Sequence, residues 1–408
     1  MRIEYKRLKD CCSKIGSGAT PKGGSSVYID SGVSLIRSQN VYNLKFSYSG
    51  LAHINDEAAN KLKGVIVNKG DVLLNITGDS VARTCVVPDE VLPARVNQHV
   101  SIIRPNKDVD SRYLNYYLAS PAMQGYLLNI ASTGASRNAI TKGMIEKLVI
   151  PFPDMDSQRR IASILSVYDN LIENNNKRIR LLEQMAENLY KEWFVRFRFP
   201  GHENAEFENG LPKGWGMERI GNVCETIGGG TPSTSKTEYW NGGIKWVTPS
   251  DITSKNSLPL LKVEVSITEE GLKNSSAKLL PPYTILMTSR ASIGFFGVAP
   301  FEVCTNQGFI SIIPQNDNLR MYMLYMLKSR KDEIIANANG STFLEISKGR
   351  FRKMKMVVPS NIILDLFENK TRTIFDETLK LEQQNTTLTR QRDLLLPRLM
   401  SGKLEVNI

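Results

Sequence analysis

The longest regular pattern of hydrophobic positions lies in the middle of the chain, between Pro153 and Pro200. Hydrophobic residues recur there at alternating steps of three and four positions from Ile161 to Trp193, which is typical of an amphipathic helix. Asp156 or Ser157 is predicted to cap its first turn. About 40 helical residues at about 1.5 Å each would form a rod about 60 Å long, so this helix is expected to need a partner.

A second helical pattern follows Pro359 and predicts that partner. Its hydrophobic positions lie at strict intervals of seven residues and are Phe367, Ile374, Leu381, Leu388 and Leu395. One edge of this seam is polar, with Thr371, Thr378, Asn385 and Arg392. Asn175 falls on the seam of the central helix, and a buried Asn in such a seam fixes register at a cost in stability. The alternative for the central segment is an ordinary amphipathic core helix.

The sequence before Pro153 has a different pattern, in which short hydrophobic runs alternate with Gly, Pro, Asn and Asp. The runs at 32–41, 64–80 and 97–105 predict strands joined by tight loops, and Ser111–Leu128 predicts a helix. This part is therefore expected to be a mixed α+β domain. The residues that follow Pro200 are polar and rich in turn formers, as in a linker.

The pattern of the first domain returns after this linker. The clearest matches are Thr20-Pro21 with Thr231-Pro232 at an offset of 211 residues, Asn97-Gln98 with Asn306-Gln307 at 209, and 140–143 with 346–349 at 206. Matches in the same order with a small drift in offset indicate a duplicated domain with a few loop insertions or deletions. Because each copy is followed by its own long helix, antiparallel pairing of the helices would relate the copies by a pseudo-twofold axis.

Composition narrows the class of protein. A net charge of +11 favours a polyanionic partner such as nucleic acid, although a basic proteome or solubility could explain it as well. The 5 cysteines have no CxxC spacing and there are 3 histidines, so zinc sites and disulfide frameworks are not expected. With no signal sequence and no long apolar run, the protein is expected to be cytoplasmic, without membrane association.

Catalytic motifs are missing from the sequence. No GxxxxGK[ST] loop is present, and the Gly-rich stretches at 16–18 and 228–230 precede Thr-Pro and are interpreted as turns. The segment Leu280–Tyr283 lacks the Asn or Asp that would accept hydrogen bonds from an adenine amino group. Cys12 and Cys224 occupy matching repeat positions and are expected to be small buried side chains. These features favour a binding protein over an enzyme.

The combination resembles the specificity subunits of type I restriction-modification systems. The residues that carry the resemblance are the central segment from Pro151 to Phe194, the tail from Leu388 to Val406, the paired turns GSGATP and GGGTP, and LPKGW before the second copy. The similarity covers nearly the whole chain. The two helices are its specific part, whereas the globular domains match in framework.

The resemblance implies an α+β fold with two repeated mixed α/β target recognition domains, separated by two long antiparallel coiled-coil helices. The expected boundaries are 1–152 for the first domain, 153–199 for the central helix, 200–214 for a linker, 215–359 for the second domain, 360–400 for the C-terminal helix and 401–408 for a tail. Each domain would recognise one half of a bipartite, asymmetric DNA target, and the helices would set the length of the spacer.

The resemblance also implies partners and cofactors. The expected partners are double-stranded DNA, two modification subunits that methylate adenine at N6, and restriction or motor subunits. No cofactor is expected in this chain, whereas the partner subunits would use S-adenosylmethionine, ATP and Mg²⁺. The chain itself is expected to be non-catalytic, within a complex that acts as a site-specific deoxyribonuclease and adenine-N6 DNA methyltransferase.

Candidate DNA-binding residues lie in the loops that follow matched strands, because Arg, Lys, Asn, Gln, Asp and Glu recognise base edges from such positions. In the first domain they are Arg37, Ser38, Gln39, Asn40, Asn75, Thr77, Arg83, Ser136, Arg137 and Asn138. In the second they are Thr248, Ser250, Asp251, Thr288, Ser289, Arg290 and Thr342. Each of these side chains could instead be an ordinary solvated loop residue.

Two further sets of candidates have a different expected role. Asn97-Gln98 and Asn306-Gln307 are identical between the copies, which suits a framework or phosphate role better than discrimination between half-sites. Lysines could neutralise phosphates and make binding sensitive to salt, and the candidates are Lys22, Lys45, Lys142, Lys236 and Lys348. Two other functions remain open: a scaffold for protein assembly, or a DNA-modifying enzyme in its own right.

Overall fold

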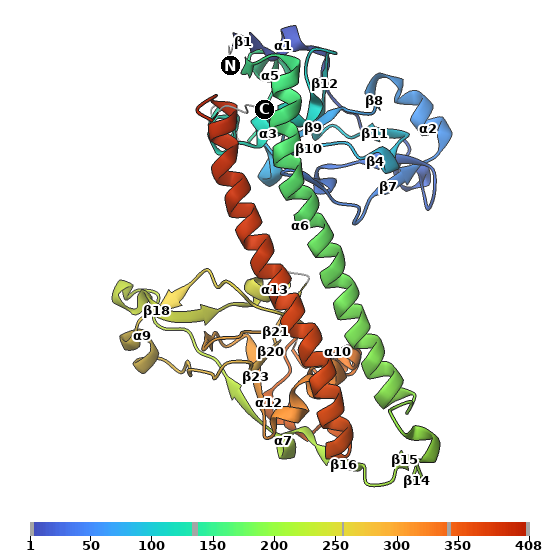
Figure 1. Ribbon diagram of the computed structural model, residues 1–408, viewed down its shortest axis with the longest axis vertical. Helices are drawn as coiled ribbons and strands as arrows, with labels where there is room; N and C mark the ends of the chain where they lie inside the picture. The colour runs from blue at the N-terminus through green and yellow to red at the C-terminus, as the bar shows by residue number, and fades with distance from the viewer. Residues whose placement is uncertain (1–3, 133–137, 255–256, 341–343, 405–408) are drawn as a thin grey trace. The chain divides into compact units, whose positions relative to one another are not determined.

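The computed structural model describes residues 4–132, 138–254, 257–340 and 344–404. The chain forms two compact units, unit 1 with Met1–Ile172 and Thr387–Ile408, and unit 2 with Glu173–Thr386. The two longest helices, α6 (Met155–Tyr190) and α13 (Asn361–Met400), contribute residues to both units (Figure 1). Each unit thus holds one globular part together with segments of both long helices, which the predicted boundaries treat as separate elements.

Unit 1 contains two main sheets. The antiparallel sheet of four strands has the order β10 (Thr84–Val86), β9 (Val72–Asn75), β12 (Val100–Pro105) and β2 (Cys12–Ser17). The sheet of five strands has the order β3 (Tyr28–Ile29), β7 (Ala52–Ile54), β4 (Val33–Ile36), β11 (Ala94–Val96) and β8 (Ile66–Val67). Unit 1 also contains two separate strand pairs, β1 (Glu4–Arg7) with β13 (Val149–Phe152) and β5 (Val41–Tyr42) with β6 (Lys45–Phe46). The shorter helices are α1 (Leu8–Cys11), α2 (Asp56–Lys61), α3 (Ser111–Ala119), α4 (Pro121–Ser132) and α5 (Lys142–Glu146).

Unit 2 repeats this plan with fewer strands. Its sheet of four strands has the order β17 (Cys224–Gly228), β23 (Phe309–Pro314), β20 (Ile285–Thr288) and β21 (Phe296–Val298). Its sheet of three has the order β19 (Ser266–Ile267), β18 (Trp240–Val247) and β22 (Cys304–Thr305). The strand pairs are β16 (Gly216–Arg219) with β24 (Lys355–Val358) and β14 (Phe207–Glu208) with β15 (Leu211–Pro212). The shorter helices are α7 (Ile220–Val223), α8 (Pro249–Thr253), α9 (Glu269–Lys273), α10 (Arg320–Ser329), α11 (Lys331–Ala336) and α12 (Lys348–Lys353).

The strand register confirms the duplication predicted from the sequence. In unit 1, β12 pairs with β2 through Ile103 and Ile15. In unit 2, the equivalent strands pair through Ile312 and Thr226, which lie at the offsets of the sequence repeat. The parallel pairing of β4 with β11 likewise returns as the parallel pairing of β18 with β22. The two globular parts therefore share one framework of strands.

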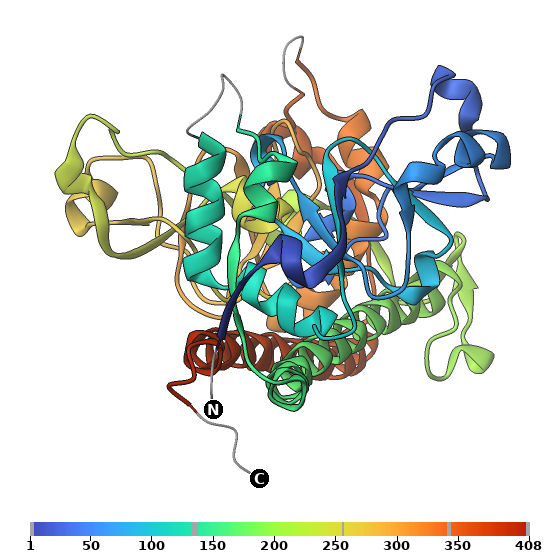
Figure 2. The ribbon, with the colours of Figure 1, turned by 90° about the horizontal axis from the view of Figure 1, so that it is seen from above.

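One helix in each unit joins the sheet to the long helices. In unit 1, α3 runs close to the long helices in the ribbon seen from above (Figure 2). Its Leu114 and Leu118 pack into the core beside the sheet, whereas Tyr113 belongs to the buried cluster of the long helices. Asp110 caps this helix by accepting hydrogen bonds from the backbone N–H groups of Arg112 and Tyr113, at 2.9 and 3.1 Å. The period of 3.6 residues makes this two-sided packing possible.

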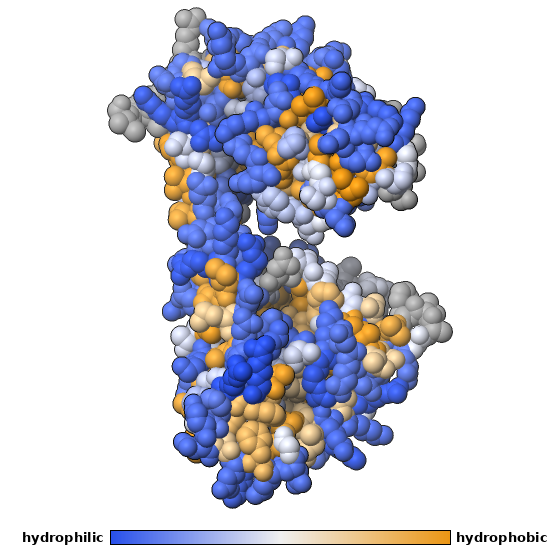
Figure 3. Space-filling model, turned by 90° about the vertical axis from the view of Figure 1, so that its right-hand side faces the viewer, coloured by the Kyte–Doolittle hydropathy of each residue, from blue (hydrophilic) through white to orange (hydrophobic). Residues whose placement is uncertain are grey.

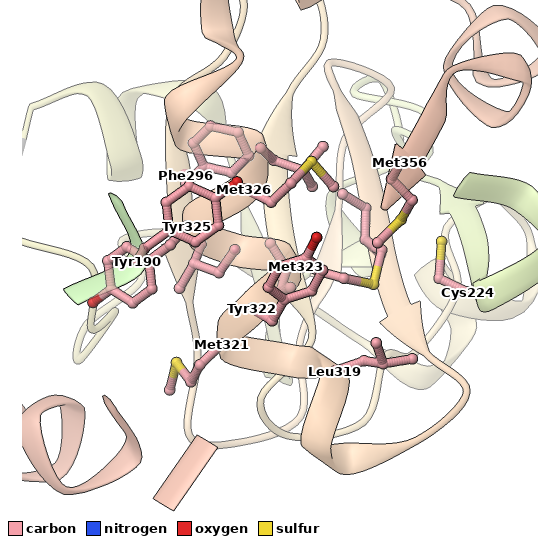
Figure 4. Packing of buried hydrophobic residues seen from close by; sticks show 14 of the residues in the cluster. Tyr190, Cys224, Phe296, Leu319, Met321, Tyr322, Met323, Tyr325, Met326 and Met356 are labelled. Carbon is pink, nitrogen blue, oxygen red and sulfur yellow. The ribbon is translucent and has the colours of Figure 1, made fainter. Parts of the chain in front are cut away.

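The equivalent helix α10 lies at the centre of the unit 2 core, where Tyr322 and Tyr325 are almost fully buried (Figure 4). The Tyr322 hydroxyl donates to the Val357 carbonyl at 2.6 Å. Tyr113 of unit 1 makes the corresponding bond to the Pro151 carbonyl at 3.0 Å. Both tyrosines thus satisfy their buried hydroxyl by tying a helix to the strand before a long helix.

In unit 1, the first part of α6 lies beside the last part of α13 (Figure 1). Leu165 and Leu399 belong to the same buried cluster as Tyr116 of α3. At its edge, Arg392 donates to Asp169 at 2.6 Å, and the Tyr116 hydroxyl donates to the other oxygen of the same carboxylate. The polar edge predicted at Arg392 is therefore satisfied by a partner on α6.

In unit 2, the last part of α6 pairs with the first part of α13. Asn175 donates to Asn385 at 3.0 Å, and Arg178 forms an ion pair with Glu377 at 2.9 Å. Residue numbers rise on one helix as they fall on the other, so the two segments run antiparallel in this unit. The buried seam position predicted for Asn175 is confirmed, since its side chain is 7% exposed.

Two polar seam positions of α13 are more buried than an edge position would be. Thr371 and Thr378 are 0% and 1% exposed. Each hydroxyl donates to the carbonyl four residues earlier in the helix, to Phe367 at 2.7 Å and to Ile374 at 2.9 Å. This internal bond removes the cost of burying the hydroxyl, so a threonine can occupy the seam.

The ends of α6 differ from the sequence prediction. The first turn is capped by Asp154, whose carboxylate accepts the Ser157 backbone N–H at 2.9 Å, rather than by Asp156 or Ser157 itself. At the other end, the α-helix changes at Tyr190 into a π-helical turn, Lys191–Val195. Phe197 then takes a left-handed conformation with φ 57°, so the helical path ends before Pro200.

The surface is mainly hydrophilic, with hydrophobic patches on both units in the view of Figure 3. Among the described residues, every helix is too short or too polar to cross a lipid bilayer.

Candidate nucleic-acid interface

The Asn-Gln pair common to both copies holds a turn in each unit. The Thr20 hydroxyl donates to Gln98 Oε1 in unit 1, and Thr231 donates to Gln307 Oε1 at 2.6 Å in unit 2. The preceding Asn306 accepts the backbone N–H of Gly308 at 2.9 Å, and Asn97 makes the equivalent bond to residue 99 at 3.1 Å. Of the two roles open for these residues, the framework role has direct structural support.

A second repeated contact involves two candidates for base recognition. Asn40 Oδ1 accepts the backbone N–H of Arg37 at 3.0 Å, and Asp251 Oδ2 accepts that of Thr248 at 2.8 Å. These side chains are buried, at 0% and 8% exposed. Each one closes a short turn after a matched strand, so direct contact with a base is not available to Asn40 or Asp251 in this conformation.

Three further candidates for base recognition are also buried. Asn75 is 0% exposed and donates to the Ser38 carbonyl at 2.9 Å. Thr288 and Ser289 are 0% and 2% exposed at the end of β20. The Thr288 hydroxyl accepts the Phe295 backbone N–H at 3.0 Å. The sequence predicted that these three residues bind DNA from loops, but their side chains are buried in the fold.

Four of the remaining candidates of the first domain do come together. A hollow of about 420 Å³, which we call the unit 1 recess, is lined by Ser38, Gln39, Tyr42, Thr77, Gly78, Asp79, Ser80, Arg83 and His99. Four of these, Ser38, Gln39, Thr77 and Arg83, were predicted from the sequence. The recess gathers groups from loops that are far apart in the chain, because the loops after β4 and β9 and the turn before β12 lie together.

Arg37 lies beside this recess but has a structural partner. Its guanidinium donates to the Gly50 carbonyl at 2.7 Å, and Gln39 Nε2 donates to the same carbonyl at 3.0 Å. Gly50 has φ 64°, a conformation that favours glycine, and this turn brings its carbonyl toward both side chains. Arg37 therefore fixes the loop from which Gln39 is presented.

Sequence reasoning missed Tyr42 and His99 as site residues. The Tyr42 ring lies under the Arg83 guanidinium, 4.7 Å from its carbon to the ring centroid. His99 Nδ1 lies 2.6 Å from the Thr77 hydroxyl. The sequence did contain one signal for His99, because it directly follows the repeated Asn-Gln pair at a position that differs between the copies, where the second copy has Gly308.

Unit 2 presents different side chains on the same framework. Thr77 forms an isolated bridge with Ala139, and the equivalent bridge in unit 2 joins Arg290 and Glu345. The Arg290 side chain is exposed and its Nε lies 3.9 Å from the Glu345 carboxylate. Ser250 is exposed in the turn that matches Gln39. The candidate interface of unit 2 thus contains exposed Ser250 and Arg290, whereas the half-buried Thr248 donates its hydroxyl to Asp251 Oδ2 at 2.8 Å.

The other candidates that the structure describes are one asparagine and several lysines, and their side chains are exposed to solvent. Lys22, Asn138 and Lys236 are exposed, as are Lys45, Lys142 and Lys348. Lys236 Nζ donates to the Tyr239 hydroxyl at 3.0 Å. Ser136, Arg137 and Thr342 lie outside the described residues.

The surroundings of the cysteine thiols disfavour their ionisation. Burial raises the pKa of Cys85, Cys224 and Cys304 to about 12, and the pKa of half-buried Cys12 is raised to about 12 for the same reason. A thiol with such a pKa carries almost no thiolate at neutral pH. Cys12 and Cys224 each begin the equivalent strand of their unit, β2 and β17, although Cys12 is less buried than expected. In the described ranges, no three His, Cys, Asp or Glu side chains are grouped to hold a metal ion.

Comparison with known proteins gives a consistent result. A family model described as the type I restriction modification DNA specificity domain matches residues 2–184 and 212–384. The specificity subunit of the MjaIX type I restriction enzyme from Methanocaldococcus jannaschii is 26% identical over 415 residues, covering 99% of this chain and 94% of that protein. The HindI specificity subunit from Haemophilus influenzae is 24% identical, covering 91% of this chain and 94% of that protein.

The fold is also found in a solved structure. The crystal structure of the S subunit of a type I restriction-modification system from M. genitalium matches with a TM-score of 0.60, covering 100% of this chain and 97% of that chain. The sequence identity is 13%, so this likeness concerns the fold alone.

Proposed function

Because the chain belongs to the family of type I restriction-modification specificity subunits, we propose that it recognises a bipartite, asymmetric DNA sequence for such a system. One observation carries the proposal: the two globular parts share a strand register but differ at loop positions that solvent reaches, such as exposed Gln39 against exposed Ser250 and half-buried Thr77 against exposed Arg290. A common framework with different contact residues suits two readers of unlike half-sites.

We assign the long helices α6 and α13 the role of a spacer. In each unit, segments of both helices are anchored to the globular part through one buried helix, by Tyr116 in unit 1 and by Tyr322 and Tyr325 in unit 2. The Asn175–Asn385 hydrogen bond fixes the register of the two helices in unit 2. An antiparallel coiled coil of this kind would set the length of DNA between the half-sites.

The chemistry is assigned to partner subunits. We propose that two modification subunits bind this chain and methylate adenine at N6 with S-adenosylmethionine, and that restriction or motor subunits use ATP and Mg²⁺. Support comes from the relatives, which are named as specificity subunits of type I restriction enzymes.

The direct test is selection of duplexes from a random DNA library by the purified full-length chain, at several salt concentrations. We expect enrichment of two half-sites separated by a spacer of fixed length, and weaker total retention as salt rises because phosphate contacts release counterions. Retention that is independent of sequence would favour a scaffold. Methylation or cleavage of DNA by the chain without partners would instead favour an enzyme.

A further inference from the structure

Four side chains form a row of hydrogen bonds beside the unit 1 recess. The Thr20 hydroxyl donates to Gln98 Oε1, Gln98 Nε2 lies 3.1 Å from His99 Nε2, and His99 Nδ1 lies 2.6 Å from Thr77 Oγ1. An amide nitrogen can only donate, so His99 Nε2 accepts from Gln98. The proton of the neutral imidazole is then on Nδ1 and is donated to Thr77. Thr77 Oγ1 is an acceptor within the row, which leaves its own proton available to the recess.

A second donor lies in the same recess. The Arg83 guanidinium is held over the Tyr42 ring, and among the described residues it has no hydrogen-bond or ion-pair partner. Its N–H groups can donate to an acceptor on a base edge, next to the acceptor that Thr77 would reach. The cation–π contact limits the positions of the side chain without using its N–H groups.

Acceptors lie in the same recess. Gln39 Nε2 uses one of its two N–H groups on the Gly50 carbonyl at 3.0 Å, so its Oε1 is available as an acceptor beside one remaining N–H. The exposed Asp79 carboxylate also lines the recess. The recess thus combines two donor side chains with two acceptor side chains.

We propose that the unit 1 recess recognises a G·C base pair, with His99 as a positioning residue that acts through Thr77. In the major groove, guanine presents two neighbouring acceptors, N7 and O6, and its cytosine presents an amino donor. Arg83 and Thr77 would donate to guanine, and Gln39 or Asp79 would accept from cytosine. Adenine places a donor beside its acceptor and so fits two donors less well. This inference rests on the proposed function.

The second copy provides a natural comparison. It retains the first step of the row, from Thr231 to Gln307, but the row ends there because Gly308 stands in the place of His99. The Phe295 carbonyl accepts the Thr288 N–H, as the Arg83 carbonyl accepts the Asn75 N–H, so Phe295 stands in the place of Arg83. The framework therefore accommodates glycine and phenylalanine at these two positions, and His99→Gly and Arg83→Phe are suitable test substitutions.

The experiment is selection from the random library by the full-length chain and its variants, at one fixed salt concentration. We expect Arg83→Phe, Thr77→Val and His99→Gly each to reduce preference for G·C at the same single base pair by about 10-fold, and to leave the rest of the motif unchanged. Because His99 acts through Thr77, His99→Gly should add nothing in the Thr77→Val background. Lys107→Ala, which removes an exposed positive charge outside the recess, should leave the motif unchanged.

Three outcomes overturn the inference. The first is an unchanged motif in Arg83→Phe and Thr77→Val. The second is an equal loss of retention for all sequences, which indicates phosphate contact, and the third is relaxation at an A·T pair. Thermal unfolding of every variant shows whether it is folded. If Arg83→Phe or His99→Gly is unfolded, the motif selected by Thr77→Val tests the inference, because valine preserves the shape of the threonine side chain. A wild-type chain without any motif would overturn the proposed function as well, so the two failures are distinguishable.

Discussion

At the residue scale, the bonds that a side chain makes within its own turn decide whether it can contact a ligand. Asn40 and Gln39 are neighbours with similar chemistry, yet Asn40 is enclosed by its own turn and Gln39 is exposed. The difference depends on turn geometry, since the Asn40 carboxamide closes a bond to the Arg37 backbone. Such local bonds compete with ligand contacts for the same residue types.

The buried Asn175–Asn385 pair allows a prediction about stability. Asn175→Leu removes the donor to Asn385 Oδ1 and leaves that acceptor buried, so we expect a loss of about 1–3 kcal/mol in the free energy of unfolding. The double change Asn175→Leu with Asn385→Leu removes both polar groups and should be more stable than the single variant.

Urea unfolding followed by circular dichroism measures this difference. Asn174→Leu is the matched control, because Asn174 is exposed next to the seam and its replacement should change stability by less than about 0.5 kcal/mol. A double variant less stable than the single variant would show that the pair contributes more than a satisfied polar contact.

At the element scale, periodicity predicts both long helices, whereas their ends are set by contacts that periodicity does not contain. The sequence offers Asp156 and Ser157 as caps, whereas the hydrogen bonds in the structure identify Asp154. The strict seven-residue pattern of α13 also drifts, so that Phe375 and Leu396 are buried beside the predicted Ile374 and Leu395. A helix of 3.6 residues per turn shifts its buried face along such a length.

The cap leads to a second stability prediction. Asp154→Ala should destabilise the start of α6 by about 1 kcal/mol, and Asp156→Ala should have a smaller effect. Hydrogen bonds from Ser157 lower the pKa of the Asp154 carboxyl. The stabilisation is therefore present at neutral pH and is lost as the pH falls through the lowered pKa.

Thermal unfolding of the two variants at neutral and acidic pH checks this assignment. The difference between Asp154→Ala and the wild-type chain should shrink in acid. Equal effects of the two substitutions at neutral pH would mean that Asp154 is not the dominant cap.

At the scale of the whole molecule, the repeat was visible in the sequence because a few framework residues keep their order and spacing. The same residues explain why the domains are equivalent, since the Thr-Gln contact and the tyrosine-to-strand bond recur in both units. Long-range packing of loops was not predictable from these matches. The unit 1 recess arises only when strands distant in sequence come together.

The spacer role predicts the effect of lengthening both helices. Insertion of four residues after Ile172 in α6 and after Thr386 in α13 adds about 6 Å of helix, which corresponds to about two base pairs of duplex. We expect a longer spacer with the same two half-sites. Insertion in α6 alone shifts Asp169 by four residues relative to Asn175, so the Asp169–Arg392 and Asn175–Asn385 contacts cannot both form. This variant should bind DNA less well and provides the matched control. A changed half-site with an unchanged spacer would contradict the role assigned to the helices.

We propose that this chain directs modification to one bipartite DNA sequence. Single-molecule real-time sequencing of genomic DNA, from cells with and without the gene for this chain, tests this role. We expect a methyladenine motif of two half-sites with a fixed spacer, present with the chain and lost on deletion. A methyladenine pattern that is unchanged on deletion, or a lost motif that is one uninterrupted sequence, would contradict it.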